Sequence, residues 1–254
     1  MSRESNNSSK SIAEFFMSKI KSSNMGDNTV RRIAKGYKRS FNGHIFDDDR
    51  FKIRVGEGKY VSGGKFSDKK PEYNVLWTLY VSFKFNHQCI LFALDDFCKY
   101  AHESSSSYNP HNPLDRSDQR ATYYLQNLAY RVLAQWDILA QFYCELDSCK
   151  TPLGEIHAMR FFKEPKYKEI ATHLKASNHQ FVRDFRNSFT HRVPDSQNYM
   201  NRENVNVRPP LGGAIDSICR DYSALLEFLK EPLDRFESIA DDMRAGSMVD
   251  EASI

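Results

Sequence analysis

The residues best suited to chemistry lie in one short stretch, Phe181 to Pro194, which holds three arginines, an asparagine and a histidine. A histidine can take up or release a proton near neutral pH. An arginine stays charged and can donate two hydrogen bonds to a phosphate. RNA can be cleaved with such groups alone, because its own 2′-hydroxyl is the nucleophile. The protein then has to move two protons and stabilise the charge that develops on the phosphorus centre.

A helix through this stretch, at about 100° per residue, separates a polar face from an apolar one. The polar face holds Arg183, Arg186, Asn187, Thr190 and His191. The apolar face holds Ile170, Leu174, Phe181, Phe185 and Phe189. Arg186 and His191 lie at the edges of the polar face, roughly 140° apart. Asn187 precedes His191 by one turn and can orient its ring, and Pro194 ends the helix because it lacks an N–H.

The pattern Arg186-Asn187-x-x-x-His191 resembles the signature of HEPN domains, the higher eukaryotes and prokaryotes nucleotide-binding family. The same spacing recurs at Arg39 and His44, but there a glycine intervenes and no helical periodicity is present. We therefore place the signature at Arg186 and His191. The resemblance implies an all-α bundle of four to five helices and, in many members, metal-independent RNA cleavage. It also implies a homodimer, in which two copies of the motif form one composite site.

The same resemblance assigns roles, all as hypotheses. His191 acts as general base or acid, Arg186 binds the scissile phosphate, and Asn187 orients His191 or contacts the phosphate. Asp137, on the preceding long helix, resembles the acidic residue that supports the arginine and histidine in HEPN nucleases. Alternatively, Asp137 is a boundary carboxylate that faces water.

The RNA backbone would be bound by further residues of the same helix end, namely Arg183, Thr190 and Arg192. No cofactor or metal is expected. The sequence departs from those HEPN toxins that carry a tyrosine shortly after the histidine, since Arg192-Val193-Pro194 follows here.

Charge and cysteine content narrow the class of protein. The net charge is +3, but residues 31–70 hold twelve Lys and Arg against five Asp and Glu. Such a local excess suits a polyanion such as RNA, although a solvated loop is the alternative reading. The five cysteines show no CxxC or zinc-like spacing, which predicts buried thiols in a cytoplasmic protein. No signal peptide or membrane-spanning run is apparent, so no membrane association is expected.

The apolar periodicity predicts four long helices, over residues 73–103, 117–149, about 167–192 and 213–244. These form a bundle domain over 72–244. Residues 1–10 are expected to be a disordered tail and 245–254 a frayed one. Residues 11–71 are expected to hold a short helix over 11–21 and a basic, irregular segment packed on the bundle. In that segment glycines such as Gly36 and Gly43 exclude a long helix, and a small hairpin can form around 50–66. His87 falls on an apolar stripe and is expected to be a core histidine.

These expectations describe an all-α, HEPN-like bundle with an irregular N-terminal insert that can include a β-hairpin. The HEPN resemblance implies a metal-independent endoribonuclease that acts as a toxin or anti-phage defence effector, with an antitoxin or a defence-complex partner. The alternative is a non-catalytic HEPN-like bundle that binds RNA, a nucleotide or a partner protein.

Overall fold

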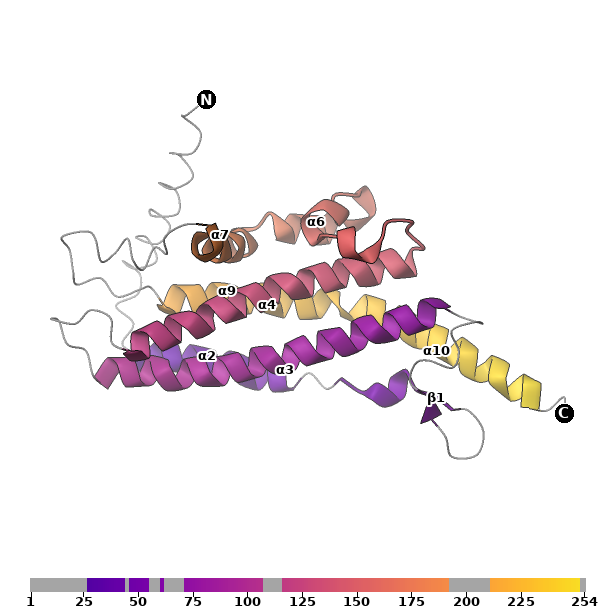
Figure 1. The fold of residues 1–254 in the computed structure, drawn as a ribbon, viewed down its shortest axis with the longest axis horizontal. Helices are drawn as coiled ribbons and strands as arrows, with labels where there is room; N and C mark the ends of the chain where they lie inside the picture. Colours follow the sequence, from indigo (N-terminus) through magenta and orange to yellow (C-terminus); the bar gives the residue numbers. More distant parts are fainter. Residues whose placement is uncertain are drawn as a thin grey trace, which may run out of the picture. The chain divides into compact units, whose positions relative to one another are not determined.

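The computed structural model describes residues 27–43, 46–54, 60–61, 71–106, 116–191 and 211–251 of the 254-residue chain. Helices account for most of them (Figure 1), which confirms the all-α class. The longer helices are α2 (Asp27–Asn42), α3 (Pro71–Ser106), α4 (Arg116–Leu146), α7 (Ser177–His191), α9 (Leu211–Phe228) and α10 (Lys230–Glu251). The shorter ones are α5 (Ala158–Phe161), α6 (Lys168–Leu174) and the 3-10 turns η1 (Asp48–Arg50), η2 (Leu153–Glu155) and η3 (Pro165–Tyr167).

A short antiparallel strand pair, β1 (Ile53–Arg54) and β2 (Tyr60–Val61), accompanies the helices. Ile53 faces Val61 and Arg54 faces Tyr60 in its register. The strands fall within the segment for which a hairpin was predicted, and their connection at 55–59 lies outside the described residues. The short helix predicted over 11–21 lies outside them as well. Among the helices that the structure describes, none combines the length and apolarity needed to cross a bilayer.

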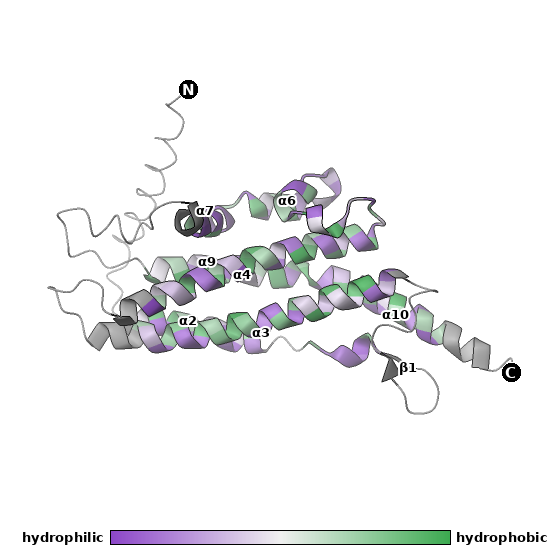
Figure 2. Cartoon of the chain, viewed as in Figure 1, coloured by the Kyte–Doolittle hydropathy of each residue, from purple (hydrophilic) through white to green (hydrophobic). Residues whose placement is uncertain are grey.

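The chain divides into two compact units, each assembled from three segments. Unit 1 comprises Met1–Gly43, Cys89–Leu133 and Leu174–Ser223. Unit 2 comprises His44–Gln88, Ala134–His173 and Ala224–Ile254. Because these boundaries fall inside α3, α4 and α9, each unit holds part of those helices, and their apolar stripes (Figure 2) supply core to both.

Helix α2 corrects the expectation that glycines exclude a long helix from residues 22–71. It continues through Gly36, where an added Cβ would meet nothing within 4 Å, so the glycine serves no close approach. A helical glycine costs only about 1 kcal/mol relative to alanine. Packing offsets that cost, because the Phe41 ring lies edge-on to Tyr222 of α9 at 5.0 Å and the Tyr37 hydroxyl donates to Asp216 at 2.9 Å.

Two predicted long helices are each broken into two. The helix expected over about 167–192 consists of α6 and α7, which are separated at residues 175–176. Ser177 and Asn178 follow the break, and both residue types favour helix starts over helix interiors. The helix expected over 213–244 consists of α9 and α10, which are separated at Leu229. Pro232 explains that break, because proline lacks an N–H and its ring crowds the carbonyl four residues earlier.

Unit 2 is held by aromatic stacking around Phe51. Its ring stacks on Phe236 of α10 with centroids 4.6 Å apart and planes 8° apart. The Tyr73 hydroxyl of α3 donates to the Phe51 carbonyl oxygen at 2.5 Å. Arg50 next to it donates from Nε to Glu237 at 3.0 Å. The segment before β1 is therefore fixed to both α3 and α10.

Asp147, just after α4, connects three distant segments of unit 2. Its carboxylate accepts hydrogen bonds from Lys166 Nζ at 2.8 Å, from the Tyr167 hydroxyl, and from Arg235 Nη2 at 2.8 Å. Burial alone would raise the pKa of this carboxyl, but the hydrogen bonds from Lys166, Tyr167 and Arg235 outweigh it and lower the pKa to about 2. The Asp147 side chain is only 18% exposed, so solvent screens these interactions weakly.

Asp147 should make the stability of the fold depend on pH in the acid range. Its folded pKa of about 2 lies below the unfolded value of about 3.9, so the carboxylate stabilises the fold above about pH 4. That contribution, on the order of 2 kcal/mol at pH 7, should fall by about half at pH 3 and disappear below about pH 2. Urea unfolding of the wild type and Asp147→Asn at pH 7 and pH 3 measures it as a difference in unfolding free energy.

The exposed Glu155 provides the matched control. Glu155→Gln should change the unfolding free energy by less than about 0.5 kcal/mol at either pH. A constant difference between wild type and Asp147→Asn from pH 7 to pH 3 would contradict the assignment.

Candidate functional site

Helix α7 carries the predicted signature on its last turns. It runs unbroken from Ser177 to His191, so Arg186, Asn187 and His191 belong to one helix. The structure describes the side chains of this helix as far as Asn187. Those of Thr190 and His191, and the whole of Arg192, lie outside the described residues. That the Arg186 and His191 side chains act together in one site therefore stays a prediction.

Three of the described polar side chains towards the end of α7 are half-buried, namely those of Arg183, Arg186 and Asn187. Arg186 follows His179 by seven residues, so the two point within roughly 20° of the same direction. The Nε atom of Arg186 is shielded from solvent. Arg186 thus lies on the side of α7 that carries His179, at the margin between the buried face and the polar one.

A buried pair joins α7 to α9 within unit 1. His179 Nδ1 lies 3.2 Å from Oδ1 and 3.1 Å from Oδ2 of Asp221. The two side chains are 1% and 0% exposed. Buried polar groups are retained when they are hydrogen-bonded, and this pair satisfies that requirement at the contact between the two helices. Because solvent does not reach it, the pair positions α7 and does not itself contact a substrate.

Sequence reasoning missed this pair. His179 has no carboxylate three or four residues away in the sequence, and Asp221 follows it by 42 residues. One signal was present, since each of the two polar residues has apolar neighbours at helical spacing, such as Val182 beside His179 and Leu225 beside Asp221. A polar residue on an apolar stripe indicates a buried partner, but not its identity.

Asp137 has local partners. Its Oδ1 accepts a hydrogen bond from the Ala158 N–H at 2.8 Å, and its Oδ2 lies 3.6 Å from His157 Nδ1. Ala158 is the first residue of α5, so Asp137 satisfies one of the amide groups that a helix start leaves unpaired. Asp137 belongs to unit 2 and Arg186 to unit 1. Its role towards Arg186 stays a prediction.

The basic segment foreseen in the sequence is in part a helix with a cationic stripe. Arg32, Lys35 and Arg39 of α2 are exposed and fall within about 60° of one another around the helix axis. The structure shows no ion pair for any of them within the residues that it describes, whereas Lys38 on another side of α2 pairs with Asp95 at 2.5 Å. An exposed row of cations attracts polyanions.

The Arg39–His44 pair and His87 are weaker candidates for a reactive site. Arg39 and His44 match the signature spacing, but α2 ends at Asn42, and His44 lies outside the described residues. His87 is 1% exposed and lies edge-on to the Phe46 ring at 4.9 Å, so the prediction of a core histidine is confirmed. Within the described ranges, no three His, Cys, Asp or Glu side chains are arranged to hold a metal ion.

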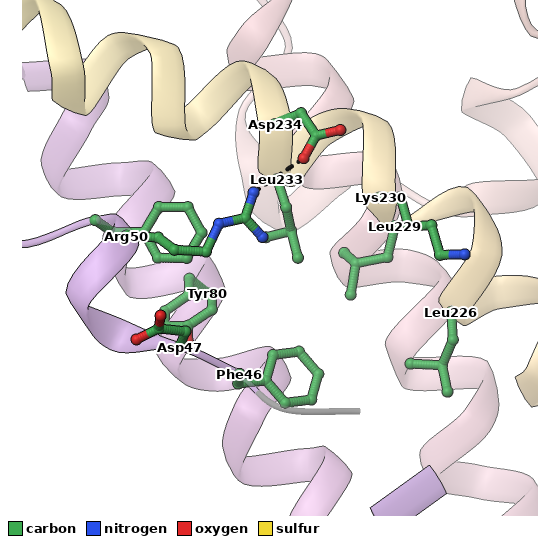
Figure 3. A pocket seen from close by; sticks show the side chains of 10 residues that line it. Phe46, Asp47, Arg50, Tyr80, Leu226, Leu229, Lys230, Leu233 and Asp234 are labelled. Atoms are coloured by element: carbon green, nitrogen blue, oxygen red, sulfur yellow. Dashed lines mark hydrogen bonds and ion pairs between the residues drawn. The ribbon is translucent and has the colours of Figure 1, made fainter. Parts of the chain in front are cut away.

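A small cavity of about 120 Å³ lies in unit 2 (Figure 3). Phe46, Tyr80 and Leu233 are among the side chains that line it. Arg50 at its edge donates from Nη2 to Asp234 at 2.9 Å. The volume is well below the roughly 300 Å³ at which pockets for small molecules begin. We therefore regard it as a packing gap.

No protein-family model matches the sequence, and no curated protein or solved structure is significantly similar to it.

The buried pair should be a major contributor to the stability of unit 1. Asp221→Ala removes the carboxylate from a buried histidine, so the unfolding free energy should fall by about 3 kcal/mol. Asp184→Ala on α7 is the control, because Asp184 makes an exposed hydrogen bond to Gln180 and its loss should cost less than about 0.5 kcal/mol. Denaturant unfolding followed by circular dichroism measures both. Equal losses for the two variants would contradict this role.

Proposed function

We propose that the protein is an RNA-binding endoribonuclease that cleaves without a metal, with Arg186 and His191 at the end of α7 as the reacting pair. The observation that carries the proposal is the continuity of α7 from His179 to His191. It keeps the arginine and the histidine at fixed positions near one helix end, and the buried Asp221 contact anchors that helix. The resemblance of Arg186-Asn187-x-x-x-His191 to the HEPN signature supplies the chemistry.

In the proposed reaction, His191 takes the proton of the ribose 2′-hydroxyl or returns one to the 5′-oxygen that leaves. Arg186 donates hydrogen bonds to the scissile phosphate and stabilises the charge that develops there. Asn187 orients His191 or contacts the phosphate. The products carry a 2′,3′-cyclic phosphate or a 3′-phosphate. One arginine and one histidine do not supply both proton transfers, so two copies of α7 face each other in a homodimer.

RNA affinity is proposed to come from two groups of basic and polar side chains in unit 1. Arg183, Thr190 and Arg192 contact the backbone near the cleaved bond. The α2 stripe of Arg32, Lys35 and Arg39 binds phosphates farther along the strand, which its exposure permits. The HEPN resemblance assigns Asp137 the role of supporting Arg186, in addition to the hydrogen bond that it accepts from the Ala158 N–H.

A non-catalytic RNA-binding bundle is the second candidate, and the α2 stripe favours it. The stripe supports binding irrespective of cleavage. A role as a toxin or anti-phage effector, with an antitoxin or a defence-complex partner, is proposed from the HEPN resemblance alone.

Cleavage should depend on both members of the reacting pair. With purified protein, labelled RNA and EDTA, His191→Ala and Arg186→Ala should each reduce the cleavage rate by at least about 100-fold, because general acid–base catalysis and phosphate stabilisation contribute on that scale. The exposed His157 and Arg160 are the matched controls, and their alanine variants should cleave at the wild-type rate. Analysis of the RNA 3′ ends should show cyclic phosphate. Cleavage that survives His191→Ala in a folded protein would refute the assignment.

RNA binding should depend on the α2 stripe and on salt. Replacing Arg32, Lys35 and Arg39 together with alanine should lower the slope of log affinity against log salt by about 2, since each phosphate contact on a single strand contributes about 0.7. Binding is measured on the His191→Ala background, so that the RNA stays intact. If binding persists without cleavage by the wild type, the non-catalytic candidate is favoured. An unchanged salt slope would exclude the stripe as the RNA contact.

A further inference from the structure

The C-terminal end of α4 brings two cysteines together. The Cys149 N–H donates to the Cys144 carbonyl oxygen at 2.9 Å, and the Ser148 N–H donates to the Glu145 carbonyl oxygen at 3.0 Å. Ser148 between them has a positive φ of 53°. These two hydrogen bonds and the left-handed residue define a Schellman motif. That motif brings into contact the side chains of its first and sixth residues, which here are Cys144 and Cys149.

The two thiols differ in accessibility. Cys144 is 1% exposed, and its thiol donates to the Thr151 carbonyl oxygen at 3.9 Å. Burial, together with a hydrogen bond to Cys149, raises the pKa of the Cys144 thiol to about 12. Cys149 is half-buried and lines an open hollow of about 610 Å³ within unit 2. A reagent can therefore reach Cys149 first, with Cys144 directly behind it.

We propose that Cys144 and Cys149 form a reversible dithiol–disulfide site that is oxidised by hydroperoxides. The backbone hydrogen bond between the two residues holds their backbones at the close approach that a disulfide requires. Both residues are free thiols in the structure, so this is its reduced state. The proposal does not rest on the proposed RNA chemistry, since neither cysteine takes part in it: both belong to unit 2, whereas Arg186 and His191 belong to unit 1.

The oxidation proceeds in two balanced steps. The Cys149 thiolate attacks one oxygen of hydrogen peroxide, so that an S–O bond forms, the O–O bond breaks, and the departing hydroxide takes a proton to become water. The Cys144 sulfur then attacks the sulfenic sulfur of Cys149, which forms the S–S bond and breaks the S–O bond. The second hydroxide leaves as water with the proton of the Cys144 thiol. Two thiols and one peroxide thus give one disulfide and two waters.

The lining of the hollow favours a small neutral oxidant. Glu72 and Glu145 both line it beside Cys149. Burial, and then the charge of Glu72, raises the pKa of Glu145, which reflects the closeness of the two carboxylates. Their negative charge repels glutathione disulfide, which is anionic, and does not repel hydrogen peroxide.

The other cysteines serve as internal controls. Cys98 and Cys219 are buried in unit 1 and should stay reduced. Cys89 is half-buried, on the unit 1 part of α3, and tests whether exposure alone is enough for oxidation. Neither cysteine of the proposed pair should form a bond to any of these three.

The test is peptide mapping by mass spectrometry of the full-length protein after treatment with hydrogen peroxide. The expected product is one intramolecular Cys144–Cys149 disulfide that dithiothreitol reverses. Phenylarsine oxide, which bridges two neighbouring thiols, should bind the reduced wild type once per chain. Cys149→Ser and Cys144→Ala should each abolish both results. The arsenical measurement on the wild type keeps the test decisive if replacement of the buried Cys144 impairs folding.

Three outcomes would overturn the proposal. Peroxide could convert Cys149 to a sulfinic acid without a disulfide, the disulfide could join either thiol to another cysteine, or the reduced wild type could fail to bind the arsenical. The role of the two glutamates has its own test. Glu72→Gln removes a negative charge beside the attacking Cys149 sulfur, so oxidation by both reagents should become faster, but only glutathione disulfide is itself repelled. The glutathione disulfide rate should therefore rise several-fold more than the peroxide rate, and an equal effect on both reagents would refute this role.

Discussion

The contact between His179 and Asp221 is the constraint on which the candidate site depends. It lies where α7 meets α9 and is closed to solvent, with both carboxylate oxygens within 3.2 Å of the imidazole Nδ1. A buried polar pair tolerates little sliding or rotation, because any displacement exposes unsatisfied groups to a low-dielectric interior. It therefore fixes the rotation of α7 about its axis. Since Arg186 follows His179 by two turns, that rotation also decides where the arginine points.

This arrangement separates two tasks along α7. The residues of α7 nearest the buried pair hold the helix in place, and the proposed function assigns the chemistry to the helix end. Asp137 on α4 also has a positioning role, since its carboxylate accepts a hydrogen bond from the first amide of α5. The groups that hold the fold are thus distinct from Arg186 and His191, to which the proposal assigns the reaction, so a test of activity in a variant has to include a test of its fold.

The sequence predicted the helices well where apolar periodicity was long, as for α3 and α4, because burial of one face dominates helix formation in a protein. The predicted helix boundaries were wrong where the effect of a single residue competed with the effect of packing. Gly36 was expected to break a helix and does not. Pro232 and the adjacent residues Ser177 and Asn178 were not expected to break a helix, and the helices end beside them. The position of Arg186 on a helix was foreseen, but its alignment with His179 and Asp221 depends on a contact between residues 42 positions apart. The local sequence pattern contains no information about a pairing over that separation. For the same reason, the sequence placed Asp137 on its helix but did not identify its partners.

The three hydrogen bonds to Asp147 have a consequence for the order in which the chain becomes structured during synthesis. Lys166 and Tyr167 leave the ribosome soon after Asp147, but Arg235 follows only after nearly ninety further residues, at a sequence separation of 88. The carboxylate is thus only partly compensated in a nascent chain, and unit 2 cannot complete this contact until α10 has emerged. Among the described helices of unit 2, α10 is for that reason the last to make its contacts.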